Sequence, residues 1–166
     1  MTETNAPFVD DEVSTRYKQA FLLVFTRLVW ACPAELYTLE DLERIELHFN
    51  AKLDPEVRPS IVVAPIPADS HVPPGIPVLA VDVLYPGDDL PAQEARKRCC
   101  ARFGVGSYWV VDPFEPSLTA FELDDKGQYR TTARVSRDEP FETTSPFPAR
   151  VVLTEPVWSR DEEDDC

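Results

Sequence analysis

One stretch of this chain limits its possible folds more than any other: the run Val78–Leu84, in which Asp82 is the only polar residue. A strand that is apolar on both faces is typical of the centre of a sheet that is covered on both sides. A carboxylate in such a strand is costly to desolvate unless a cation, a metal or several donors meet it. The segment ends at Tyr85-Pro86-Gly87, so Asp82 lies near the end of the strand where sites in α/β proteins tend to form.

Two helices are predicted. The first runs from about Thr15 to Ala31, because apolar residues recur there at helical spacing and Ser14 is a suitable N-cap. The second follows Asp88 or Asp89, either of which can cap it, and runs to about Phe103 before a glycine.

The remaining pattern predicts strands, which are short apolar or alternating segments bounded by turn residues. They are Glu35–Thr38, Arg44–Phe49, Ile61–Ala64, Gly106–Pro113, Leu118–Leu123 and Gln128–Val135, with a last extended stretch over Pro140–Leu153. The order of helices and strands predicts a mixed α/β fold, in which one parallel strand-helix-strand crossover lies inside a largely antiparallel sheet.

The length of 166 residues suggests a single domain. We expect a flexible arm over residues 1–12, one domain over 13–159 and an acidic, disordered tail over 160–166. Acidic residues number 30 and basic residues 16, which gives a net charge of -14. This charge disfavours non-specific binding to DNA, although a local basic patch would still be compatible with it.

The sequence also gives an expectation for the cellular compartment of the protein. Its four cysteines, Cys32, Cys99, Cys100 and Cys166, show no Cys-x-x-Cys spacing and imply no disulfide framework. No signal peptide is visible, and the longest apolar run, Ala20–Ala31, is too short to span a bilayer. We therefore expect a cytoplasmic protein with no membrane association.

From Arg58 to Trp158 the chain carries a series of blocks in a characteristic order. They are Arg58-Pro59-Ser60-Ile61, Gly75-Ile76-Pro77-Val78, Asp82-Val83-Leu84-Tyr85-Pro86, Ala101-Arg102-Phe103-Gly104-Val105, Ser107-Tyr108-Trp109-Val110-Val111-Asp112-Pro113 and Ser145-Pro146-Phe147-Pro148. In order and spacing this series resembles the Uma-two family of restriction-endonuclease-like proteins, within the PD-(D/E)XK nuclease superfamily. The Tyr-Trp-Val-Val-Asp-Pro block is its most specific part.

The resemblance implies a restriction-endonuclease-like fold and, for an active member, a Mg-dependent endonuclease. In that chemistry two carboxylates on adjacent strands hold Mg²⁺ or Mn²⁺, which stabilises the charge on the phosphate and generates hydroxide from water. A nearby lysine orients the water and adds positive charge at the transition state. The substrate would be DNA, and a homodimer would suit the family.

Several positions depart from the family pattern. Ser60 stands where the family has its first Asp, and Asp82 where it usually has Glu. Arg96 stands at the helix Lys, with Lys97 one position later, and Cys100 replaces the helix Tyr. Serine is a weak neutral ligand, and arginine stays protonated and cannot replace lysine in proton transfer. Lys97 is rotated about 100° around the helix from Arg96.

These departures leave alternatives open at each position. Asp82 is either a metal ligand or a buried anion that Arg96 or Lys97 neutralises. Ser60 is either the position of a lost ligand or a serine that bonds a local N–H. The basic residues of the second helix either touch DNA phosphates or form a solvated helix face; they are Arg96, Lys97, Arg98 and Arg102. Replacement ligands are conceivable in four other carboxylates: Glu46, Asp54, Glu56 and Asp69.

Two functions follow from these alternatives. The first is a metal-dependent endonuclease with a modified or impaired site, in which Asp82 binds the metal and Arg96 or Lys97 contacts phosphate. The second is a non-catalytic relative, a pseudoenzyme that keeps the fold for binding a protein or nucleic-acid partner.

Overall fold

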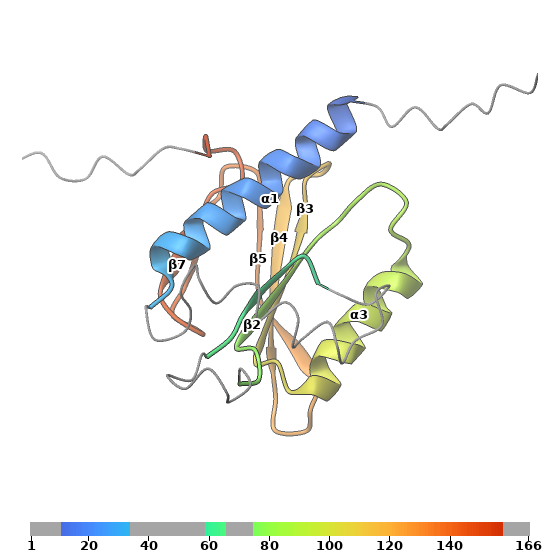
Figure 1. The fold of residues 1–166 in the computed structure, drawn as a ribbon, viewed down its shortest axis with the longest axis vertical. Coiled ribbons are helices and arrows are strands. Elements are labelled where there is room, and N and C mark those ends of the chain that lie inside the picture. Colours follow the sequence, from blue (N-terminus) through green and yellow to red (C-terminus); the bar gives the residue numbers. More distant parts are fainter. Residues whose placement is uncertain (1–10, 34–58, 66–74, 158–166) are drawn as a thin grey trace, which may run out of the picture.

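The structure is a computed structural model that describes residues 11–33, 59–65 and 75–157. Its elements are α1 (Asp11–Ala31), β1 (Ile61–Val63), β2 (Leu79–Val83), α3 (Leu90–Phe103), β3 (Ser107–Asp112), β4 (Ser117–Leu123), β5 (Tyr129–Ser136), β6 (Phe141–Thr143) and β7 (Ala149–Val151). The helices α1 and α3 lie on opposite sides of the sheet (Figure 1). Neither is long and apolar enough to cross a membrane.

Strands β1 to β5 form one five-stranded sheet in sequence order. Strand β2 pairs with β3 in parallel, and every other neighbouring pair in this sheet is antiparallel. The parallel pair needs a crossover connection, which α3 provides. The predicted mixed α/β fold with one strand-helix-strand crossover is therefore confirmed.

The ends of α3 follow from its capping residues. The side chain of Asp89 accepts a hydrogen bond from the N–H of Ala92 at the N-terminus, where Pro91 lies in the first turn. At the C-terminus Gly104 adopts a left-handed conformation, with φ at 84°, and its N–H donates to the carbonyls of the last turn. The predicted limits of this helix are confirmed.

Two boundaries differ from the prediction. Helix α1 begins at Asp11, so Ser14 lies inside its first turn and is not the N-cap, and residues 11 and 12 do not belong to a flexible arm. The acidic pair Asp11 and Glu12 favours this earlier start, because negative charge stabilises a helix N-terminus. The extended stretch predicted for Pro140–Leu153 is a hairpin of β6 and β7.

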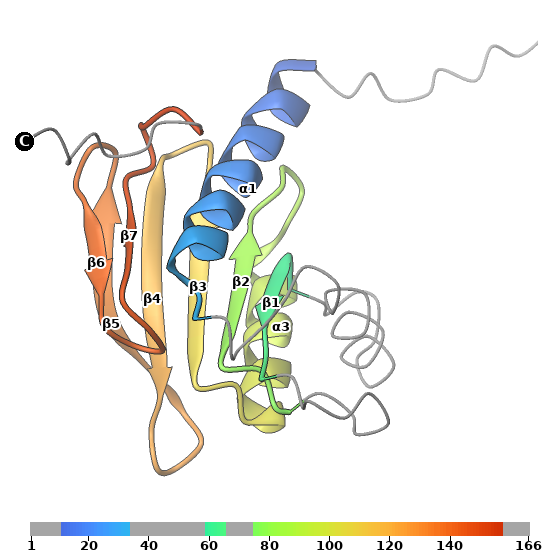
Figure 2. The ribbon, with the colours of Figure 1, turned by 60° about the vertical axis from the view of Figure 1, so that its left-hand side comes forward.

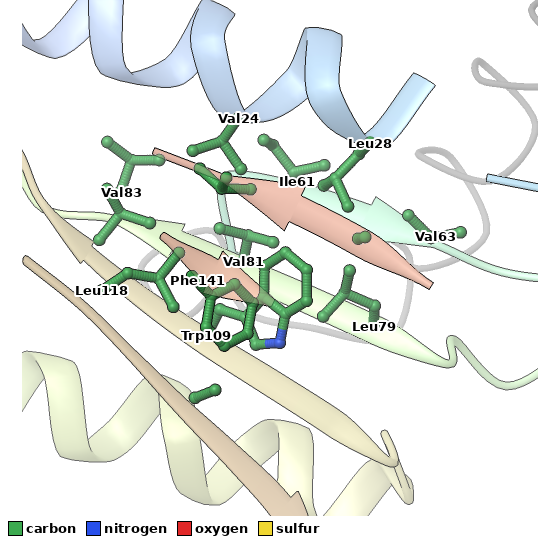
Figure 3. Packing of buried hydrophobic residues seen from close by; sticks show 14 of the residues in the cluster. Val24, Leu28, Ile61, Val63, Leu79, Val81, Val83, Trp109, Leu118 and Phe141 are labelled. Atoms are coloured by element: carbon green, nitrogen blue, oxygen red, sulfur yellow. The ribbon is translucent and has the colours of Figure 1, made fainter. Parts of the chain in front are cut away.

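Alternation along the strands divides the core between the two faces of the sheet. On the α1 side, Val24 and Leu28 of α1 pack over Ile61, Val81 and other strand residues (Figure 3). Trp109 meets Phe141 edge-on there, with ring centroids 4.9 Å apart. The α3 side is smaller and contains Ala80, Cys100, Val105 and Tyr108. Strand β2 is buried on both faces, as the apolar run predicts.

The hairpin of β6 and β7 completes the α1 side of the sheet. Phe141, Val151 and Phe147 belong to the same cluster of buried residues as α1. The hairpin lies at the β5 end of the sheet (Figure 2). The strands predicted over 35–38 and 44–49, and most of the predicted arm and tail, lie outside the described residues.

Candidate functional site

Asp82 lies on the α3 side of β2, an interior strand of the sheet between β1 and β3. Leu79, Val81 and Val83 point toward α1, so the alternation of a strand turns Asp82 the other way. Only 3% of its surface is exposed. A carboxylate buried to this degree needs partners in the protein.

The principal partner is Arg96, which α3 carries over the sheet. Its Nε donates to Oδ2 of Asp82 at 2.6 Å, and Arg96 is itself only 7% exposed. Burial alone would lower the pKa of Arg96, but the hydrogen bond and charge of Asp82 raise it above its ordinary value. The two residues therefore form a buried, charge-assisted ion pair.

Tyr108 of β3 is the second partner. Its hydroxyl donates to the same Oδ2 atom at 3.1 Å, and its ring stacks on Tyr129. Burial raises the pKa of Tyr108, and so does the neighbouring charge of Asp82, which keeps the phenol protonated as a donor. Burial likewise raises the pKa of Asp82, although the bonds from Arg96 and Tyr108 oppose that shift.

Asp88 is a second carboxylate on the same guanidinium. Its Oδ1 lies 3.3 Å from Nη1 of Arg96, and its Oδ2 accepts the N–H of Tyr85 at 2.8 Å. The remaining guanidinium nitrogen, Nη2, is buried and has no hydrogen-bond partner among the described residues. In the described part of the chain the guanidinium thus lies between two carboxylates, and the N–H groups of its Nη2 meet no acceptor.

The sequence did not identify Tyr108 or Asp88 as site residues. Tyr108 is buried like a residue of the core, and its hydroxyl also meets Asp82. The contact between Tyr108 and Asp82 depends on the register of β2 against β3, which places Tyr108 opposite Ala80. The sequence pattern of a single strand does not reveal this register. Asp88 was considered only as a helix cap.

Ser60 lies beside Asp82, one register step before the pair Ile61 and Val81. Its N–H donates to the carbonyl of Val81 at 2.8 Å, and its Oγ accepts the N–H of Val83 at 3.0 Å. The hydroxyl therefore extends the pairing of β1 with β2. The structure brings Ser60 into the neighbourhood of Asp82, as the motif positions predict.

The other basic residues of α3 lie apart from Asp82. Lys97 points toward β4, where its Nζ lies 3.9 Å from the centroid of the Phe121 ring. Arg98 and Arg102 are exposed and lie one helical turn apart on the outer face of α3. The structure thus separates Arg96 from the two arginines that were grouped with it as a DNA-binding set.

The residues of this site are poorly suited to bind the divalent cation that the resemblance implies. In the described part of the chain no three His, Cys, Asp or Glu side chains gather as metal ligands. The guanidinium of Arg96 already contacts both carboxylates, and the unpartnered Nη2 adds positive character to the same space. The replacement ligands Glu46, Asp54, Glu56 and Asp69 lie outside the described residues.

Two comparisons found known proteins that this chain is similar to. The family profile described as "Putative restriction endonuclease", Uma2, matches residues 30–155. No curated protein matches. Among solved structures, a putative nuclease belonging to DUF820 from Anabaena variabilis ATCC 29413 aligns over 64% of this chain and 69% of its own, with 17% identity and a TM-score of 0.41. Because the profile match spans most of the chain, this protein belongs to the Uma2 family.

Proposed function

We propose that this protein is a nuclease-fold member of the Uma2 family whose metal-dependent DNA-cleavage site is impaired. The observation that carries the proposal is the buried pair of Asp82 with Arg96. A carboxylate that already neutralises a guanidinium at 2.6 Å contributes little to offsetting the dehydration of Mg²⁺.

Two further features support impairment. The Oγ atom of Ser60 accepts a backbone N–H, and a neutral hydroxyl supplies no charge for a hard cation. Arg96 stands at the family's lysine position, and a guanidinium stays protonated near neutral pH and cannot act as a general base. Electrostatic stabilisation of a phosphoryl transition state would require a second carboxylate ligand and a lysine in this space.

Plasmid cleavage in Mg²⁺ or Mn²⁺ tests the proposal. Wild type and Asp82→Asn should give the same low background, because the site provides no cleavage for the substitution to remove. The Asp82→Asn protein is also the control for contaminating nucleases. Cleavage by wild type that disappears in Asp82→Asn would show instead a live Mg-dependent endonuclease with a modified site.

The outer face of α3 favours a second candidate function, a non-catalytic module that binds nucleic acid or protein. Arg98 and Arg102 are exposed there in an otherwise acidic chain, while Arg96 is held inside. Phosphate contacts would make DNA binding strongly salt-dependent. A gel-shift series with the Arg98→Ala/Arg102→Ala protein separates the cases: loss of a salt-sensitive complex indicates DNA, and no complex for wild type leaves a protein partner.

A further inference from the structure

We propose that a pocket at the N-terminal end of β3 receives an arginine side chain from a partner protein. The pocket has a volume of about 470 Å³. Its polar part consists of two acceptors on adjacent strands, the hydroxyl of Ser107 in β3 and the carboxylate of Glu122 in β4. It lies on the other side of the sheet from Asp82, so the inference does not depend on whether the site at Asp82 cleaves DNA.

The two acceptors lie side by side on the α1 side of the sheet. Ser107 is opposite Glu122 in the antiparallel pair of β3 and β4, and residues opposite each other have Cβ atoms about 5 Å apart. Trp109 and Ala120 form the next pair on this face and belong to the buried cluster under α1. Because side chains alternate along a strand, Ser107 and Glu122 face the same side as that pair.

Neither acceptor has a partner within the described residues. The carboxylate of Glu122 forms no hydrogen bond or ion pair there, and the hydroxyl of Ser107 forms no hydrogen bond. The residue opposite Glu122 on β5 is Arg130, but its Nε donates to Oδ2 of Asp124 at 2.8 Å. Ser107 is buried except where it lines the pocket, and Glu122 is partly buried. A partly buried carboxylate without a partner favours a cation that comes from another molecule.

The walls of the pocket are mostly apolar. They include Ile76, Pro77, Val78 and Pro146, and Ile76 is 57% exposed at the rim. Apolar walls around a few fixed polar groups are typical of binding pockets. These walls suit the methylene stem of an arginine, and Ile76 offers a contact to an apolar neighbour of that arginine in the partner.

The acceptors match a guanidinium better than an ammonium group. A carboxylate accepts with two oxygens and the serine hydroxyl adds a third acceptor, whereas a guanidinium presents five N–H donors in one plane. The backbone around them is already held in place. The N–H of Ser107 donates to the carbonyl of Val78 at 3.0 Å, and that of Leu123 to Gly106 at 2.9 Å. The net charge of -14 also attracts a basic partner.

The test is an NMR titration of the isotope-labelled full chain with the peptide acetyl-Leu-Arg-Leu-amide. The same peptide with citrulline in place of arginine keeps the shape but lacks the charge. We expect the arginine peptide to shift the amide signals of Gly104, Gly106 and Ser107, and the citrulline peptide to bind at least tenfold more weakly. Glu122→Gln should weaken binding of the arginine peptide at least tenfold. Glu115→Gln is the matched control, because it removes an exposed carboxylate from the turn between β3 and β4.

Four results would overturn the proposal. They are no shift of the pocket amides, equal binding of the arginine and citrulline peptides, an affinity of Glu122→Gln equal to that of Glu115→Gln, and binding of acetyl-arginine-amide as tight as that of the peptide. The last result would mean that the pocket takes a free small cation and not a protein. If Glu122→Gln does not fold, Ile76→Ala at the exposed rim replaces it, and an unchanged affinity for the arginine peptide then rejects the pocket.

Discussion

At Asp82 two physical effects act in opposite directions on one carboxylate. Burial raises its pKa above the ordinary value of 3.8, while the hydrogen bonds from Arg96 and Tyr108 lower it, and burial is the larger effect. The ion pair therefore offsets only part of the desolvation that this strand imposes.

This direction of shift predicts how stability depends on pH. The unfolded chain releases the proton of Asp82 near pH 3.8, whereas the folded protein keeps it to higher pH. The stabilising contribution of Asp82 to the folded protein is therefore present below pH 3.8 and is lost as the pH rises through the raised pKa. Urea unfolding between about pH 3.5 and 7 should show the difference in unfolding free energy, wild type minus Asp82→Asn, falling with pH.

Asp124 provides a control of opposite sign. The backbone N–H of Gln128 is the main group that lowers the pKa of Asp124 below 3.8, so its contribution is present above 3.8 and is lost as the pH falls. The difference between wild type and Asp124→Asn should therefore rise with pH in a lower window, which extends from below the lowered pKa of Asp124 to just above 3.8. A flat difference for Asp82 would contradict the assigned direction.

At the scale of elements, local signals located α3 and β2 in the sequence. The cap at Asp89, the glycine at 104 and the apolar run around Asp82 act within a few residues, and each is visible without knowing what packs against it. The start of α1 at Asp11 was missed because Ser14 is a good cap, yet acidic residues before it extend the helix.

The contacts around Asp82 were only partly predictable. The pairing with Arg96 was one of two alternatives, because the helix position of Arg96 follows from the motif spacing. The contact of Asp82 with Tyr108 depends on the register of β2 against β3. The contact of Asp88 with Arg96 depends on the geometry of the turn before α3. Tertiary packing sets both, and no single-sequence periodicity encodes it.

The C-terminal cap of α3 gives a prediction at this scale. Gly104→Ala should lower the free energy of unfolding by about 1 kcal/mol, because alanine is strained at a φ of 84°. Within the described residues an added Cβ would meet only Ile76, at 3.9 Å, so we expect backbone strain to account for the cost. Gly106→Ala is the control: its φ is not in the left-handed region and its Cβ would lie 3.8 Å from a carbonyl oxygen. Equal losses of unfolding free energy for Gly104→Ala and Gly106→Ala, measured with urea, would contradict this account.

At the scale of the whole molecule, the sheet divides the protein into two apolar layers, and segments from both ends of the described chain close the larger one. Arg27 of α1 is only 8% exposed and reaches the C-terminal segment. Its guanidinium donates to the carbonyls of Pro156 and Val157, each at 3.1 Å, and to Glu155 at 3.4 Å. Arg27 and Val157 are 130 residues apart in the sequence, so this contact joins the two ends of the described chain.

Arg27→Met keeps most of the apolar stem but removes these donors, so the segment around Val157 should detach from α1. We expect the free energy of unfolding to fall by about 2 kcal/mol. The loss is substantial because the guanidinium of Arg27 is buried, but it is limited because Glu155 is partly solvated. Urea unfolding measures the loss, and hydrogen exchange should show faster exchange at Glu155. Arg16→Met is the matched control, since its pair with Glu12 on the same helix is exposed and should contribute under about 0.5 kcal/mol. Similar losses for both variants would mean that the Arg27 contact does not hold the two ends together.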